Sequence, residues 1–94
     1  MTDAGSGGQV RLSDTTFEYV YILRCSNGKT YVGHTANVEE RLNRHIKGSV
    51  PATKNIRPVI LLTYLTFTDK YKAIAFEKYL KSGSGRAFLK KRLI

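Results

Sequence analysis

The sequence predicts a small domain of the α/β class, more narrowly α+β, in which helices flank a three-stranded mixed or antiparallel sheet. Two runs rich in β-branched and aromatic residues, 17–23 and 29–35, are separated by a turn signal, and a longer apolar run covers residues 59–67. Apolar residues at helical spacing mark residues 38–47 and 71–80. With a short basic segment at the end, the predicted order is strand, strand, helix, strand, helix, helix.

The first two strands form a predicted hairpin. Asn27-Gly28 supplies the positive φ values that a tight hairpin turn needs. Gly33 interrupts the second strand, which predicts either a bulge or a close approach by another backbone, such as that of a ligand.

The first helix has sequence signals at both ends. Asn37 is a favourable N-cap, and Gly48 ends the helix. Its predicted inward stripe consists of Val38, Leu42 and Ile46.

The second half of the chain begins with a polar, basic loop over residues 49–58. Residues 59–67 form the most hydrophobic run, which predicts a central strand. Asp69 is expected to cap the next helix, whose inward positions are Ala73, Phe76 and Leu80. Ser82-Gly83-Ser84-Gly85 should end that helix, and residues 86–93 form a short basic final one.

Composition sets the class of protein. Residues 1–15 are Gly/Ser-rich, so we expect a flexible N-terminal tail, with the folded domain over residues 16–94. No apolar run approaches the roughly 20 residues that a membrane span needs, and no secretory signal is evident. The single cysteine, Cys25, has no disulfide partner, and we expect a small buried hydrophobic residue in a cytoplasmic protein.

Positive charge is concentrated in the second half of the chain. Residues 1–40 carry three Lys/Arg and five Asp/Glu, a net charge of −2, whereas residues 41–94 carry thirteen and two, a net charge of +11. Such asymmetry favours a nucleic-acid partner over a membrane, because Lys and Arg that neutralise phosphates release counterions. Lysines solvated on helix faces are the plain alternative.

Several side chains could carry chemistry, although each has an ordinary structural explanation when taken singly. Arg41 and His45 lie one helical turn apart at the edge of the inward stripe, where an Arg can bind phosphate and a His can move a proton. Tyr21 and Tyr31 lie on the two hairpin strands and could equally be packing residues. Glu77 could hold a hydrated Mg²⁺ or form a salt bridge with Lys78 or Lys81.

Together these residues resemble the GIY-YIG nuclease family. Tyr19-Val20-Tyr21 and Tyr31-Val32-Gly33 stand for the two halves of its motif, with Tyr19 in place of the first glycine. Arg41, His45 and Glu77 follow in order and at matching spacing. The string from Glu77 to Phe88 resembles the small stand-alone bacterial members, which are similar to an excision-nuclease subunit of DNA repair.

The resemblance implies a metal-dependent endonuclease that hydrolyses DNA phosphodiester bonds. Glu77 would ligate one Mg²⁺ or Mn²⁺, and Tyr21 would be the general base, its hydroxyl acidified by its surroundings or relayed through His45. Tyr31 and Arg41 would orient the phosphate. The residues expected to contact the nucleic acid are His34, Arg44, Lys54, Arg57, Lys81, Arg86 and Lys90.

Substrate choice is left open. We expect selectivity for DNA structure, such as a branch or nick, rather than for sequence, and a homodimer or a partner protein could supply it. A basic nucleic-acid-binding module with the same fold and little or no cleavage is the alternative function.

Overall fold

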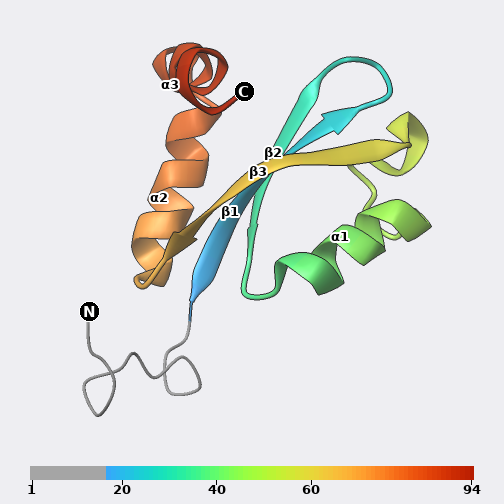
Figure 1. The fold of residues 1–94 in the computed structure, drawn as a ribbon, viewed down its shortest axis with the longest axis horizontal. Coiled ribbons are helices and arrows are strands. Elements are labelled where there is room, and N and C mark those ends of the chain that lie inside the picture. The colour runs from blue at the N-terminus through green and yellow to red at the C-terminus, as the bar shows by residue number, and fades with distance from the viewer. Residues whose placement is uncertain (1–16) are drawn as a thin grey trace, which may run out of the picture.

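The computed structural model describes residues 17–94 and contains three strands and three α-helices in the predicted order (Figure 1). The predicted flexible tail lies outside the described residues. The elements are β1 Glu18–Cys25, β2 Thr30–Thr35, α1 Val38–Lys47, the 3₁₀ turn η2 Lys54–Ile56, β3 Val59–Phe67, α2 Lys70–Leu80, α3 Gly83–Phe88 and the π-helical turn η3 Leu89–Leu93.

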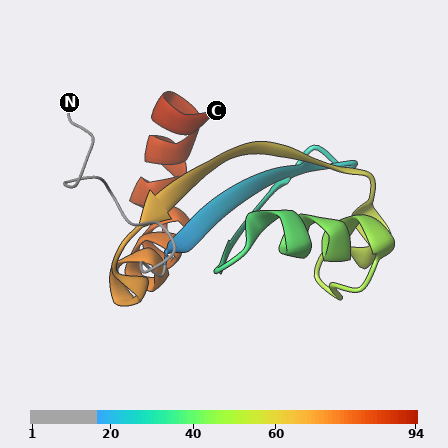
Figure 2. The same ribbon diagram turned by 60° about the horizontal axis from the view of Figure 1, so that its bottom comes forward.

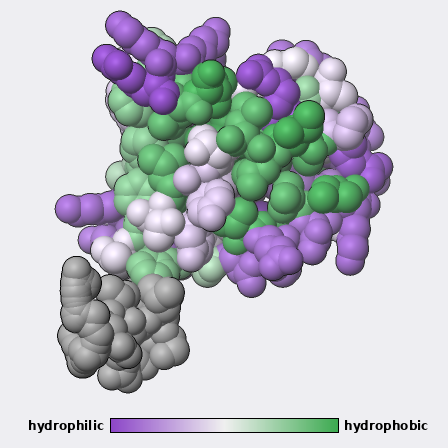
Figure 3. Space-filling model, viewed as in Figure 1, coloured by the Kyte–Doolittle hydropathy of each residue, from purple (hydrophilic) through white to green (hydrophobic). Residues whose placement is uncertain are grey.

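The sheet is antiparallel throughout, with the strand order β2-β1-β3. The prediction that residues 59–67 form the central strand is therefore wrong, because β1 lies in the middle and β3 lies at an edge. Burial explains the difference, since β1 is covered on both faces whereas β3 leaves Ile60 and Tyr64 61% and 50% exposed. Figure 3 shows hydrophobic side chains at the surface along the course of β3. The hydrophobicity of residues 59–67 alone therefore did not distinguish an apolar edge strand from a central strand.

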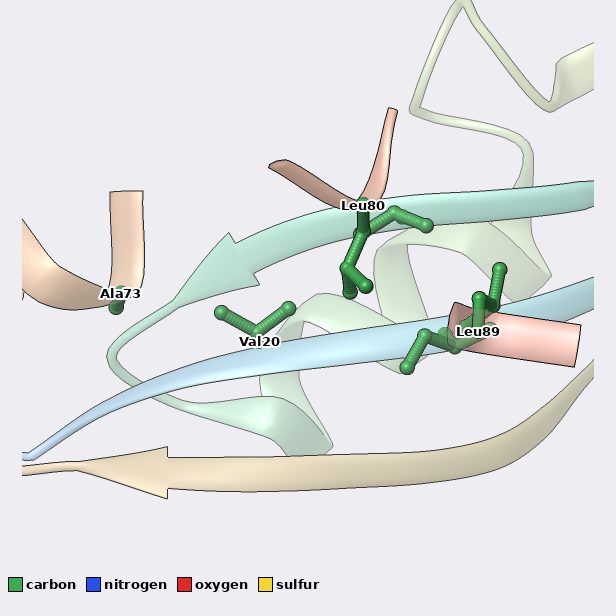
Figure 4. Packing of buried hydrophobic residues seen from close by; sticks show 6 residues of the cluster. Val20, Ala73, Leu80 and Leu89 are labelled. Atoms are coloured by element: carbon green, nitrogen blue, oxygen red, sulfur yellow. The ribbon is translucent and has the colours of Figure 1, made fainter. Parts of the chain in front are cut away.

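The two faces of the sheet carry different helices. Val20, Ile22 and Val32 pack with residues of α2 and η3 in the main hydrophobic core (Figure 4). Tyr21 lies between Val20 and Ile22, so its side chain points to the opposite face, where it meets His45 of α1. Figure 2 shows α1 running beneath the strands, with α2 and α3 gathered at their other end.

Helix α1 begins and ends as predicted, but it turns a different residue inward. The Asn37 side chain accepts the Glu40 N–H at 3.0 Å, and Gly48 ends the helix with φ of 81°. Ile46, expected in the inward stripe, is 54% exposed, whereas His45 is fully buried. The imidazole can be buried because both of its ring nitrogens have hydrogen-bond partners.

The C-terminal helices follow the prediction less closely. Asp69 caps α2, and Ala73 and Leu80 are buried as expected. Helix α2 ends at Leu80, before the expected break, but the break is shorter than residues 82–85: Ser82 caps α3 through the Gly85 N–H, and the final helical segment starts at Gly83 rather than at residue 86. Gly85 allows this, since a Cβ there would overlap the Tyr79 carbonyl. No helix in the described part of the chain is long and apolar enough to cross a membrane.

Candidate active site

A buried chain of hydrogen bonds connects β1, α1 and the loop that follows α1. The Tyr21 hydroxyl lies 2.9 Å from Nε2 of His45, and Nδ1 of His45 lies 2.7 Å from Oγ1 of Thr53. Tyr21 is 2% exposed, and His45 and Thr53 are fully buried. A neutral imidazole has one donor and one acceptor nitrogen, so one of the two hydroxyls of Tyr21 and Thr53 donates to the ring while the other accepts from it. The arrangement therefore has a path for moving one proton.

Gly33 makes room for the Tyr21 ring. The two residues are direct partners in the β1–β2 register, and a Cβ on Gly33 would lie 2.5 Å from the Tyr21 hydroxyl oxygen and 2.7 Å from Cζ. The pairing of β1 with β2 is regular from Tyr19 to Arg24, so Gly33 does not form the bulge that was one of its expected roles. The close approach is made by an aromatic ring of the same chain rather than by another backbone.

Tyr31 and Arg41 lie beside this chain and are only partly buried. The Tyr31 ring centroid is 5.0 Å from that of His45 and 6.2 Å from that of Tyr21. The Arg41 guanidinium is close enough to act electrostatically on both Tyr21 and His45. Its Nε is buried and has no hydrogen-bond partner in the described residues, so one polar group of this cluster is left unsatisfied. The structure thus brings together Tyr21, Tyr31, Arg41 and His45.

The surroundings shift the proton affinity of the two central groups. Burial raises the pKa of the Tyr21 phenol, the neighbouring Tyr31 raises it further, and Arg41 opposes the shift. The expectation that the surroundings acidify Tyr21 is therefore wrong, and the hydroxyl is the protonated form. Burial, with Arg41 and Arg44, lowers the pKa of His45, so this imidazole is neutral at neutral pH. Of the two expected routes, only the relay through His45 has supporting geometry.

Glu77 lies on the other face of the sheet, at the β2 edge. His34 follows Gly33 on β2, so its side chain points away from Tyr21 and toward α2. There His34 Nδ1–H donates to Oε2 of Glu18 at 2.7 Å, and Nε2 lies 3.7 Å from Oε1 of Glu77. The other Glu77 oxygen pairs with Lys81 at 2.6 Å, which is the salt bridge considered as an alternative role. The expected metal ligand therefore belongs to a separate polar cluster of Glu18, His34, Glu77 and Lys81.

This cluster fits a single hard divalent cation. The Glu77 Oε1 atom has no hydrogen bond in the described residues, and its side chain is 16% exposed. Mg²⁺ and Mn²⁺ are commonly held by one carboxylate, with water and substrate phosphate completing the coordination. Within residues 17–94 no group of three or more His, Cys, Asp and Glu could hold a metal, which argues against a zinc-type cage.

The other expected nucleic-acid contacts are dispersed. Arg44 and Lys54 are exposed on α1 and η2. Arg57 has a structural role, because its guanidinium donates to the carbonyls of Ile46 and Lys54 and lies against Gly48. Arg86 and Lys90 are exposed and face the β1–β2 turn.

Sequence reasoning missed two residues of these clusters, Thr53 and Glu18. Thr53 lies in the loop expected to be polar and exposed, and no motif distinguishes its buried hydroxyl from others. Glu18 is a charged residue at the start of a hydrophobic strand, and that position was the one signal of its burial, which leaves it 7% exposed.

Comparisons with known proteins found a matching family model and several relatives of this chain. Residues 17–92 match the GIY-YIG catalytic domain. A UPF0213 protein of Staphylococcus haemolyticus is 38% identical over 73 residues, covering 77% of this chain and 89% of the relative. One of Pediococcus pentosaceus is 38% identical over 77 residues, covering 78% and 81%. The solution NMR structure of the UPF0213 protein BH0048 from Bacillus halodurans is similar with a TM-score of 0.52 at 31% identity, covering 80% of this chain and 83% of that one.

Proposed function

Because this chain belongs to the GIY-YIG catalytic-domain family, we propose that it is a metal-dependent endonuclease that hydrolyses DNA phosphodiester bonds. The observation that carries the proposal is the buried Tyr21–His45–Thr53 chain, with Tyr31 and Arg41 beside it. His45 is buried with both ring nitrogens bonded, but the neighbouring Arg41 Nε is buried without a partner in the described residues, and packing alone does not account for that unsatisfied group.

Arg41 and Tyr31 are the residues that meet the phosphate in this proposal. Both are more accessible than Tyr21 and His45. The Tyr31 ring contacts both of their rings, and the Arg41 charge acts on both groups. A guanidinium placed beside a phosphate oxygen stabilises the negative charge that grows during attack by water.

Tyr21 and His45 together accept the proton of the attacking water. A free tyrosinate is disfavoured because burial raises the Tyr21 pKa, so the transfer is concerted. The water proton passes to the Tyr21 oxygen as the Tyr21 proton passes to Nε2 of His45. The resulting hydroxide forms the new P–O bond while the bond from phosphorus to the leaving 3′ oxygen breaks, and that oxygen takes a proton from solvent. His45 Nδ1–H then donates to Thr53, which holds the tautomer that this step requires.

Glu77 would hold one Mg²⁺ or Mn²⁺, with His34 positioned beside it by Glu18. A cation held there would polarise a phosphate oxygen and stabilise a leaving oxygen. Because Glu77 lies on the opposite face of the sheet from Tyr21, the cation would act on the phosphate that Arg41 contacts only across the β2 edge. Lys81 competes for Glu77 in its absence, so cation binding would release the Lys81 ammonium toward the nucleic acid. Arg44, Lys54, Arg86 and Lys90 are the proposed backbone contacts, which would favour DNA shape over base sequence.

A binding module without cleavage is the second candidate. The Glu77–Lys81 ion pair favours it, because a carboxylate neutralised by lysine is a poorer metal ligand. Incubating the protein with branched, nicked and plain DNA in Mg²⁺ or Mn²⁺ separates the two candidates. Cleavage that Glu77→Gln abolishes supports the endonuclease, whereas binding to every substrate with no product supports the module.

A further inference from the structure

A basic pocket lies between the β1–β2 turn and the C-terminal helices. Its volume is about 610 Å³, and four cationic side chains line it: Arg24 and Lys29 from the hairpin, and Arg86 and Lys90 from α3 and η3. No Asp or Glu is among the lining residues in the described part of the chain. Both walls are at the top of Figure 1, and the surface over α3 in Figure 3 is strongly hydrophilic.

Four like charges converge here with no Asp or Glu side chain among the lining residues, which also include Ile94, so an anion in the pocket would relieve their repulsion. The turn constrains the position of Arg24, whose guanidinium lies 3.4 Å from the Gly28 carbonyl oxygen. Arg57 and Lys81 make shorter contacts within the protein, at 3.0 Å and 2.6 Å. The pocket residues are therefore a group of cations that converge on one place and can bind an external phosphate.

The pocket shares a face and an edge with Glu77. Arg24 pairs with Thr30 in the β1–β2 register, and Thr30 and His34 point to the same face of β2 because their positions differ by an even number. Thr30 and His34 are four residues apart on β2, a distance of about 13 Å. This distance equals the axial rise of about four nucleotides in one strand of B-form DNA.

We propose that this pocket is a second phosphate site that holds the nucleic-acid backbone about four nucleotides from the phosphate that lies nearest the His34–Glu77 cluster. The proposal rests on the proposed function for its substrate. The new element is the path of the bound nucleic-acid strand, which runs along the β2 edge from the His34–Glu77 cluster to the pocket.

Binding measurements test the proposal without relying on cleavage. Fluorescence anisotropy of a labelled DNA duplex is followed between about 50 and 200 mM salt, with each variant made in the Glu77→Gln background. Arg24→Ala with Lys29→Ala, or Arg86→Ala with Lys90→Ala, should reduce the slope of log K against log salt by about 0.9 for each phosphate that the variant no longer neutralises. All four residues are at the surface, and thermal unfolding of each variant checks the fold.

The matched control is Lys70→Ala with Lys72→Ala, which removes the same charge from the exposed first turn of α2. That turn follows Phe67, which pairs with Glu18 at the end of the sheet opposite the hairpin. An equal decrease of slope in the control, or an unchanged slope in both pocket variants, would overturn the proposal. So would ³¹P NMR in which the pocket variants lose binding of inorganic phosphate yet bind DNA like the parent. Failure of the nuclease proposal alone would leave these slopes as predicted.

Discussion

The Tyr21 hydroxyl lies 2.9 Å from Nε2 of His45, and the two residues come from positions 24 apart in the chain. This contact joins the central strand to α1 at a point where neither side chain reaches solvent to a substantial extent. It orders a phenol and an imidazole for proton transfer next to Arg41 and Tyr31. Because of this contact, both the stability of the fold and the proposed proton transfer depend on His45.

His45 should make the fold sensitive to mild acid. Its pKa is lowered in the folded protein, so between the ordinary value of about 6.5 and the lower folded value the unfolded chain binds more protons. Stability is therefore full above about pH 6.5 and falls as the pH decreases through that window. Urea unfolding at about pH 7 and about pH 5 measures the decrease, and His45→Gln should show less of it. An NMR titration in which His45 protonates at or above the ordinary pKa of histidine would refute this explanation.

Thr53→Val should destabilise the protein by about 1–3 kcal/mol, because the valine fills the same volume but leaves buried Nδ1 of His45 without its partner. Thr66→Val is the control, since Thr66 is exposed on β3 and its change should be within about 0.5 kcal/mol. Denaturant unfolding of both variants gives the comparison. Equal effects would mean that the Thr53 hydroxyl has no special role.

Gly33→Ala should displace the Tyr21 ring, because the added Cβ would lie 2.5 Å from its hydroxyl oxygen. We expect destabilisation of about 1–3 kcal/mol and the loss of any activity that depends on the Tyr21–His45 contact. Gly83→Ala is the matched control, since nothing lies within 4 Å of its Cβ position and its φ is not in the left-handed region. A Gly33→Ala protein that keeps the His45 NMR shifts of the parent would contradict the packing argument.

Mn²⁺ should bind beside His34 and broaden the resonances of His34 more strongly than those of His45. The chain contains only these two histidines, so their imidazole ¹H resonances report separately on the two faces of the sheet. Paramagnetic broadening is expected for His34, which lies 3.7 Å from Glu77, and should disappear in Glu77→Gln. Broadening of His45 first, or broadening of His34 that persists in the variant, would place the cation elsewhere.

Local signals predicted most of the fold. Asn27-Gly28, Asn37, Gly48 and Asp69 act over a few residues, and each has the expected role. The errors concern properties set by packing of distant segments. The hydrophobicity of a run does not indicate whether a strand pairs on one or both of its sides. For this reason the prediction placed β3 at the centre of the sheet, although it lies at an edge.

The site shows the same division. Motif spacing predicted that Tyr21, Tyr31, Arg41 and His45 belong together, and the structure brings them together. The inward orientation of His45 depends on Thr53, which the loop supplies from a segment with no recognisable signal. The separation of Glu77 from Tyr21 follows from strand alternation, but only once the helix that covers each face is known.

Cleavage of a defined DNA duplex or branched DNA in Mg²⁺ or Mn²⁺, compared between the parent, Tyr21→Phe and Glu77→Gln, is the decisive assay for the endonuclease proposal. We expect cut products with the parent, a rate lower by about 10²–10⁴-fold for Tyr21→Phe, and none for Glu77→Gln, with DNA binding retained in both variants. Cleavage by Tyr21→Phe at the parent rate would refute the proton relay. Absence of cleavage by the parent on every substrate, with binding intact, would refute the endonuclease assignment itself.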